Sequence, residues 1–334
     1  MYVQDMTYMP QLVKISDVQE LLQHSQRAVI AVSGGADSMM LLHWFAQHRD
    51  KFTTEFLVMH VNHNIMGASA QWAQQVQQAS QAWGFEHVVV ELEKNQLQGN
   101  LEHAARRARY QAFCQQDIDC IITAHHANDQ IENFLLRIFR GSGIKGLKAM
   151  TAQASCWFDP HKQVVRPLLN VTREQIMDYN RHHDISWCHD PSNQDTTYDR
   201  NYIRGVIWPT VLQRFDIADV NALRSIHHLG EAWDLVNCLA DQDLQTVTID
   251  AVTWSWPKLR DLGYLRIKNL LLRVLDQTNQ YGYSVGHIEN FARGLLAATS
   301  DSRTELSLKN LTIQKHGHKI HLLGGKLDTL VPKT

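Results

Sequence analysis

The sequence predicts an α/β protein in which a doubly wound parallel sheet is followed by a smaller, mainly helical region. Three observations support this prediction. Short apolar runs alternate with longer amphipathic runs through the first half of the chain, as in successive βαβ units. A glycine-rich turn separates the first apolar run from the helical pattern that follows it. After Pro209 the pattern becomes mostly helical.

The first half contains four apolar runs with the length of buried parallel strands, each followed by a stretch of helical periodicity. The expected strands are 28–32, 56–61, 87–91 and 120–124, and the expected helices are 38–47, 68–83, 100–116 and 127–139. A short strand over 164–169 and a helix over 172–183 complete this part. We therefore expect a first domain over residues 1–212.

The rest of the chain predicts two further parts. Residues 213–300 are mainly helical, and LRIKNLLLRVLDQ at 265–277 is the clearest amphipathic run. Residues 301–334 alternate apolar and polar side chains around KHGHK, which indicates a hairpin-like C-terminal tail.

Composition excludes several classes of protein. The 334 residues are 44% hydrophobic and 20% charged, as in an ordinary globular protein. No apolar stretch is long enough to span a membrane and no signal peptide is recognisable, so we expect a cytoplasmic protein without a membrane partner. The five cysteines form no Cys-x-x-Cys pair, which argues against an iron–sulfur cluster or structural zinc. With a net charge of −2, any contact with nucleic acid requires a local basic patch.

The turn SGGADS, residues 33–38, follows the first expected strand and has the composition of a phosphate-binding loop. Glycines let a phosphate approach the backbone, and the N-terminus of the next helix favours an anion. The turn has no lysine, as a Walker A loop requires, and does not match Gly-x-Gly-x-x-Gly. Because a bare carboxylate would repel phosphates, Asp37 is expected to hold Mg²⁺ or to face another cation. The alternative is a simple turn in which Asp37 or Ser38 caps the helix.

SGGADS resembles the pyrophosphate loop of the N-type ATP pyrophosphatases, which cleave ATP between the α and β phosphates to adenylate a substrate oxygen. Further stretches are similar, in order and spacing, to the tRNA(Ile)-lysidine synthetases over about residues 27–212. These stretches are EHAARRARYQAF (102–113), TAHHANDQIENFLLRIFRGSGIKGL (123–147), RPLL (166–169) and WCHDPSNQDTTYDRNYIRGVIWP (187–209).

The resemblance implies a ligase that adenylates C2 of the wobble cytidine in isoleucine tRNA with a CAU anticodon. Free L-lysine then displaces AMP to give lysidine, which changes codon reading from AUG to AUA. ATP is thus the expected cosubstrate and Mg²⁺ the expected metal, and a homodimer is left open. Longer members have an additional C-terminal domain that helps to hold tRNA. We therefore expect recognition to depend on the first two domains, the second being a helical tRNA-binding domain, and on the tail.

The resemblance and the residue pattern together assign candidate roles. The expected ATP-binding residues are Ser33, Gly34, Gly35, Ala36, Asp37, Ser38, His63 and Arg109, with Asp37 also the candidate Mg²⁺ ligand. The expected catalytic or lysine-binding residues are Asp37, Asp129, Glu132, His125 and Arg204, and the expected tRNA-binding residues are Arg137, Arg140, Lys145 and Arg200. Asp129 and Glu132 are three residues apart, which places both carboxyl groups on one helix face.

Other readings stay open at this point. Family members commonly have two adjacent aspartates where this chain has Asn128-Asp129, so Asn128 is assigned no catalytic role. An ATP- and tRNA-binding module without catalysis would account for Asn128. A tRNA thiolase of the same superfamily is disfavoured because such enzymes generally need catalytic cysteines. NAD synthetase is disfavoured by the stretch DPSNQDTTYDRNYIR. His125 and His126 lack further ligands at zinc spacing.

Overall fold

The protein is described here by a computed structural model over residues 12–62, 69–92, 101–191, 195–278, 280 and 283–324. The chain divides into two compact units, Met1–His227 and His228–Thr334. The division falls within helix α10 (Ala218–Val247), which begins in one unit and ends in the other. It lies later in the chain than the boundary expected at residue 212.

The first unit contains a six-stranded sheet with the order β3-β2-β1-β4-β6-β5. Neighbouring strands are parallel except for β5, which runs antiparallel to β6 at one edge. The strands are β1 (Arg27–Ala31), β2 (Glu55–Asn62), β3 (Glu86–Glu91), β4 (Cys120–Ile122), β5 (Gln153–Ser155) and β6 (Gln163–Val165). The predicted parallel sheet is confirmed, and β5 was not expected because its sequence, QAS, contains no apolar run like those of β4 and β6.

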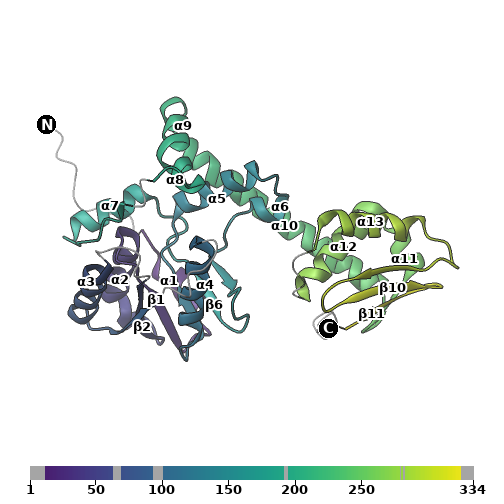
Figure 1. Ribbon diagram of the computed structural model, residues 1–334, viewed down its shortest axis with the longest axis horizontal. Coiled ribbons are helices and arrows are strands. Elements are labelled where there is room, and N and C mark those ends of the chain that lie inside the picture. The colour runs from purple at the N-terminus through teal and green to yellow at the C-terminus, as the bar shows by residue number, and fades with distance from the viewer. Residues whose placement is uncertain are drawn as a thin grey trace. The chain divides into compact units, whose positions relative to one another are not determined.

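Helices cover both faces of this sheet, as the alternation along β1 requires (Figure 1). Ala28 and Ile30 belong to the core beneath α2, whereas Val29 belongs to the core beneath α4. The helices of this unit are α1 (Ile15–Leu22), α2 (Ala36–His48), α3 (Ser69–Ala82), α4 (Leu101–Cys114), α5 (Ala127–Phe139), α6 (Ile144–Leu147), α7 (Arg173–His182), α8 (Asp199–Tyr202), the π-helical turn η4 (Ile203–Ile207) and α9 (Trp208–Arg214), with the short 3₁₀ turn η1 (Arg49–Lys51). The doubly wound arrangement is therefore the predicted one.

The second unit packs the end of α10 and three further helices against a five-stranded antiparallel sheet with the order β7-β8-β11-β10-β9. Its elements are β7 (Thr248–Asp250), β8 (Thr253–Ser255), α11 (Trp256–Asp261), α12 (Tyr264–Gln277), α13 (Val285–Ala297), β9 (Thr304–Ser307), β10 (Thr312–His316) and β11 (Lys319–Leu323).

The predicted hairpin is present as β10 and β11, and its turn contains Gly317 at φ +59°. It is not a separate tail, since β11 also pairs with β8 and thereby completes the sheet. The short strands β7 and β8 gave no alternating signal. None of the described helices is both long and apolar enough to cross a membrane.

Candidate active site

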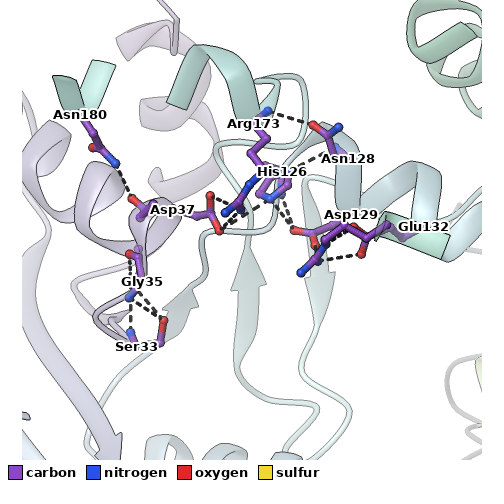
Figure 2. Close-up of polar contacts among 12 residues, drawn as sticks. Ser33, Gly35, Asp37, His126, Asn128, Asp129, Glu132, Arg173 and Asn180 are labelled. Carbon is purple, nitrogen blue, oxygen red and sulfur yellow. Dashed lines mark hydrogen bonds and ion pairs between the residues drawn. The ribbon is translucent and has the colours of Figure 1, made fainter. Parts of the chain in front are cut away.

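The strand order places the candidate site at the point where the winding of the sheet reverses. The chain proceeds from β1 outward to β2 and β3 on one side, while β4 and β6 lie on the other side of β1. Parallel α/β sheets bind ligands at the carboxyl ends of their strands at such a point. The SGGADS loop follows β1 and the two histidines follow β4, so both groups of candidates lie at this edge (Figure 2).

The SGGADS loop is held by its own hydroxyl groups. The Ser38 hydroxyl donates to the Gly35 carbonyl at 2.9 Å and accepts from the Ser33 backbone N–H at 3.2 Å. Gly34 has φ +90°, a conformation that other residues rarely adopt. In the part of the chain that the structure describes, no side chain caps the N-terminus of α2, which leaves the first N–H groups of that helix available to an anion.

Two residues that the sequence analysis did not identify hold the loop from outside. The Cys188 backbone N–H donates to the Gly34 carbonyl at 2.8 Å. The fully buried Asn180 of α7 donates through Nδ2 to the Ala36 carbonyl at 3.0 Å. Both lie far from the loop in sequence, so no local pattern could have predicted these contacts.

Asp37, in the first turn of α2, faces a guanidinium group and an imidazole. The Arg173 guanidinium lies 3.4 Å from both carboxylate oxygens, and His126 Nε2 lies 3.7 Å from Oδ2. Arg173 is the first residue of α7 and was not singled out by the sequence analysis. A cation opposite Asp37 was one of the two expected arrangements.

His126 connects Asp37 to Asp129. It is the N-cap of α5, and its Nδ1 accepts from the Asn128 backbone N–H at 3.2 Å. In the neutral ring Nε2 therefore bears the hydrogen, 3.7 Å from Asp37 Oδ2 and 3.6 Å from Asp129 Oδ2. The imidazole thus lies between the loop carboxylate and the α5 carboxylate, as Figure 2 shows.

Two arginines hold the carboxylates of α5. Arg200 donates through Nε to Glu132 and through Nη2 to Asp129, both at 2.6 Å. Arg204 donates to Glu132 through Nε at 2.6 Å and through Nη2 at 2.9 Å. The side chains of Glu132 and Asp129 are only 4% and 11% exposed. Charge-assisted pairs of this kind are short and fix the position of the carboxyl group that they hold.

Neighbouring charges set two further protonation states. Burial acts to raise the pKa of Asp129, but His126, Arg200 and His125 oppose it and leave that pKa below the usual value. Burial, together with Arg166, Arg200 and Arg106, outweighs the attraction of Asp129 and lowers the pKa of His125 to about 3. Near neutral pH the site therefore combines an ionised Asp129 with a neutral His125, whose Nδ1 hydrogen-bonds to the Thr123 hydroxyl at 2.8 Å.

Asn128 has a structural partner. Its Oδ1 accepts from the Arg173 backbone N–H at 2.9 Å, at the first turn of α7. The contact joins α5 to the residue that pairs with Asp37. An amide oxygen performs this task as well as a carboxylate oxygen.

Arg109 lies near enough to His60 for its charge to act on that residue. His60 in β2 hydrogen-bonds through Nδ1 to the carbonyl of Val32, the residue before the loop, at 2.9 Å. Burial lowers the pKa of His60, and the charge of Arg109 lowers it further. Arg106 instead lies with its guanidinium carbon 5.3 Å from the ring centre of Tyr110. His63, the other expected ATP-binding residue outside the loop, lies outside the described residues.

The expected tRNA-binding residues separate into two places. Arg137, Arg140 and Lys145 are exposed at the end of α5 and in α6. Arg200 lies instead with Glu132 and Asp129, where it makes the two short hydrogen bonds described above. The structure therefore groups Arg200 with Arg204 rather than with the surface cations.

The carboxylate and imidazole groups of the site are potential metal ligands. Among the described residues, no three His, Cys, Asp or Glu side chains are placed to share a metal ion, which excludes a closed zinc site built from that part of the chain. Mg²⁺ requires less protein, since it binds through one or two carboxylates together with substrate phosphates and water. Asp37 fits this role because its carboxylate lies in the first helical turn and its contacts are all 3.4 Å or longer.

Comparison with known proteins agrees with this geometry. The PP-loop domain family matches residues 8–211. The tRNA(Ile)-lysidine synthase of Photobacterium profundum is 34% identical over 317 residues, which cover 90% of this chain and 69% of that protein. The chain belongs to the tRNA(Ile)-lysidine synthase family.

Other members of the tRNA(Ile)-lysidine synthase family match over similar lengths. The Nitrosomonas europaea protein is 34% identical over 300 residues, 89% of this chain and 65% of that one. The Proteus mirabilis protein is 30% identical over 315 residues, 92% of this chain and 70% of that one. The chain thus spans between 65% and 70% of the length of these relatives.

A solved structure supports the fold. The U34-tRNA thiolase NcsA from Methanococcus maripaludis, described with its [4Fe-4S] cluster, superimposes with a TM-score of 0.52 over 65% of this chain and 78% of that one. At 15% identity this similarity concerns the fold alone.

Proposed function

We propose that this chain forms lysidine at the wobble cytidine of isoleucine tRNA with a CAU anticodon, using ATP and free L-lysine. The observation that best supports the proposal is that a phosphate-binding loop and an arginine-held carboxylate pair lie at one sheet edge, joined by His126. Such a site can hold a triphosphate at one side and a cationic amine at the other.

In the first step, the C2 oxygen of cytidine attacks the α-phosphorus of ATP and the bond to the β-phosphate breaks. The loop from Ser33 to Ser38 and the N-terminus of α2 would hold the departing pyrophosphate. Arg109 would add positive charge on the same side. When bound, Mg²⁺ would be held by Asp37 and would neutralise charge on the phosphates.

In the second step, the lysine amine attacks C2, the C2–O bond breaks, AMP leaves and the amine loses a proton. We assign Asp129 to receive the amine, since both oxygens of Glu132 accept from arginine, whereas Asp129 accepts from arginine through Oδ1 and from the His126 backbone N–H through Oδ2. Because its pKa is low, Asp129 is ionised and attracts the ammonium form of lysine. We assign Glu132, Arg200 and Arg204 to positioning Asp129, and neutral His125 to the wall of the same site.

The tRNA requires a local basic surface, because the chain has a net charge of −2. Arg137, Arg140 and Lys145 supply exposed positive charge beyond the carboxylate pair on α5 and α6. We propose that they contact tRNA phosphates, and that the second unit contacts another part of the tRNA.

The thiolase alternative is not favoured. Cys114 and Cys156 do lie close together, with sulfur atoms 3.8 Å apart. Burial and the neighbouring Cys156, however, raise the pKa of Cys114 to about 12, which suppresses the thiolate that a sulfur-transfer reaction needs. This pair also packs in the core beneath α4, away from the loop.

Pyrophosphate release tests the proposal directly. The full chain would be supplied with ATP, Mg²⁺ and lysine together with isoleucine tRNA transcript containing CAU, with methionine tRNA transcript, or with no RNA. We expect release and lysine incorporation with the isoleucine transcript alone. Release without RNA would indicate a small-molecule substrate instead, and ATP binding without any release would indicate a binding module.

A further inference from the structure

The helical segment formed by α8 and η4 presents different residues on its two sides. Arg200 and Arg204 reach the buried carboxylates of α5. Tyr202, the last residue of α8, lies two positions before Arg204, about 200° away around a helix, and Tyr198 is the extended residue directly before the first turn of α8. The two tyrosines and the two arginines that hold the carboxylates therefore belong to one short segment of the chain.

Both tyrosine rings are open to solvent. Tyr198 is 50% exposed and Tyr202 is 46% exposed, and neither hydroxyl hydrogen-bonds to any residue that the structure describes. Aromatic side chains usually bury most of their area, and adjacent exposed rings are typical of a binding surface. The Tyr202 backbone N–H donates to the Tyr198 carbonyl at 2.9 Å, so both tyrosines lie at the start of the same helical segment, close enough in the chain for one ligand to contact both.

Positive charge and a third ring lie beside these tyrosines. Arg140 Nη2 is 3.5 Å from Asp199 Oδ2, which brings the end of α5 next to the start of α8, and the two helices lie side by side in Figure 1. Phe139, the last residue of α5, is 64% exposed. Arg137 and Lys145 are also exposed in this region. Exposed rings interleaved with cations suit unpaired nucleotides, whose bases stack while their phosphates pair with the cations.

We propose that Tyr198 and Tyr202 form a stacking surface for unpaired anticodon bases next to the cytidine that reacts. This inference rests on the proposed function. To bring C2 to ATP, the cytidine must leave the stack of the anticodon loop, and its neighbours then lose a stacking partner. The tyrosine rings replace that stacking partner. They would lie about one helix diameter, roughly 10 Å, from the carboxylates held by Arg200 and Arg204.

The arrangement also explains why recognition and chemistry share one helix. A base stacked on Tyr202 restrains the segment that contains Arg200 and Arg204. These arginines in turn position Asp129 and Glu132. Tyr198 and Tyr202 are therefore positioning residues, which do not touch the reacting atoms.

The test measures stacking separately from charge. The adenosine of the CAU anticodon is replaced by 2-aminopurine, whose fluorescence is quenched by stacking, and the transcript is titrated with full-length protein. In the double variant Tyr198→Ala/Tyr202→Ala we expect the quenching to be lost and the affinity to fall about 5- to 150-fold. The double variant Tyr198→Phe/Tyr202→Phe keeps both rings and should bind within about twofold of wild type. Phe215→Ala, which removes another exposed ring of the same unit, is the matched control.

Salt dependence supplies a second criterion. The tyrosine-to-alanine variant should keep the slope of log affinity against log salt, whereas Arg140→Ala should reduce the slope by about one. The inference is overturned if the alanine variant of an active enzyme binds within twofold of wild type, or if the phenylalanine variant loses as much affinity as the alanine variant. A wild-type protein that releases no pyrophosphate with the isoleucine transcript overturns the proposed function itself, which separates the two failures.

Discussion

Arg204 holds Glu132 through both carboxylate oxygens, with hydrogen bonds of 2.6 Å from Nε and 2.9 Å from Nη2. Arg200 shares one of these oxygens and extends the contact to Asp129. Two guanidinium groups from a distant part of the chain therefore supply the partners that a buried carboxyl group needs at Glu132.

Replacing Arg204 tests this dependence. Arg204→Lys keeps the charge but loses the two parallel hydrogen bonds, so Asp129 and Glu132 are less well positioned. We expect lysine incorporation to fall about 10- to 100-fold and the free energy of unfolding to fall by about 1–3 kcal/mol. Urea denaturation and single-turnover kinetics measure these effects. Arg214→Lys, at an exposed position on α9, is the control, and equal behaviour of the two variants would refute the positioning role.

Gly34 is expected to tolerate no side chain. Its φ of +90° strains any other residue, and an added Cβ would lie 3.4 Å from Cys188 Sγ and from Val76 Cγ2. Gly34→Ala should lower stability by about 1–3 kcal/mol and weaken ATP binding. Gly230→Ala in α10 meets open space and should instead be neutral or slightly stabilising. Thermal unfolding with and without ATP distinguishes these outcomes.

Asp37 is predicted to matter for the reaction far more than for folding. Its pairing with Arg173 is long and partly exposed, so Asp37→Asn should change stability by less than about 1 kcal/mol. Pyrophosphate release should nevertheless fall about 100-fold or more, because the charge that organises the phosphates is lost. Asp50→Asn removes an exposed ion-paired aspartate and provides the control. Full activity in Asp37→Asn would exclude Asp37 from the ATP site.

His43 is expected to make folding sensitive to acid. Burial, and then the neighbouring His183 and His48, lower the pKa of His43 from 6.5 to about 4. The unfolded chain therefore binds more protons between these pH values, so stability is full above pH 6.5 and is lost as the pH falls toward 4.

The free energy of unfolding should fall by roughly 2 kcal/mol between pH 7 and pH 5 because of His43. A His43→Gln variant, whose side chain does not titrate, should lose that part of the pH dependence. His316→Gln, at an exposed position, should keep it. Urea titrations at both pH values give the comparison, and equal slopes in all three proteins would contradict the prediction.

Asn128→Asp tests whether the missing aspartate limits catalysis. Because Asn128 Oδ1 accepts from the Arg173 backbone N–H, an aspartate would keep this contact. We expect pyrophosphate release to change by no more than about threefold, less than 0.7 kcal/mol. A large gain from an inactive wild type would instead support the binding-module alternative.

Much of the first unit follows from local patterns. Residues on β1 alternate between two cores, and the glycine-rich turn directly follows the strand, so period and turn chemistry together predict the parallel sheet and the phosphate loop. The three-residue strands β5, β7 and β8 were not predicted because they contain polar side chains and lie in no apolar run, unlike β4 and β6, which are equally short. In the structure β5 pairs with β6, and β7 pairs with β8, which in turn pairs with β11.

The sequence by itself determined the loop, the carboxylate pair three residues apart on one helix, and the family to which the chain belongs. The tertiary structure decided the partners of these groups. Arg173 opposite Asp37, Asn180 on the loop, and Arg200 on Glu132 rather than on the exposed surface all join segments more than 60 residues apart. Opposite charges and hydrogen-bonding groups interact strongly only when they lie within a few ångströms of each other. Which groups come that close depends on how the sheet and its helices pack.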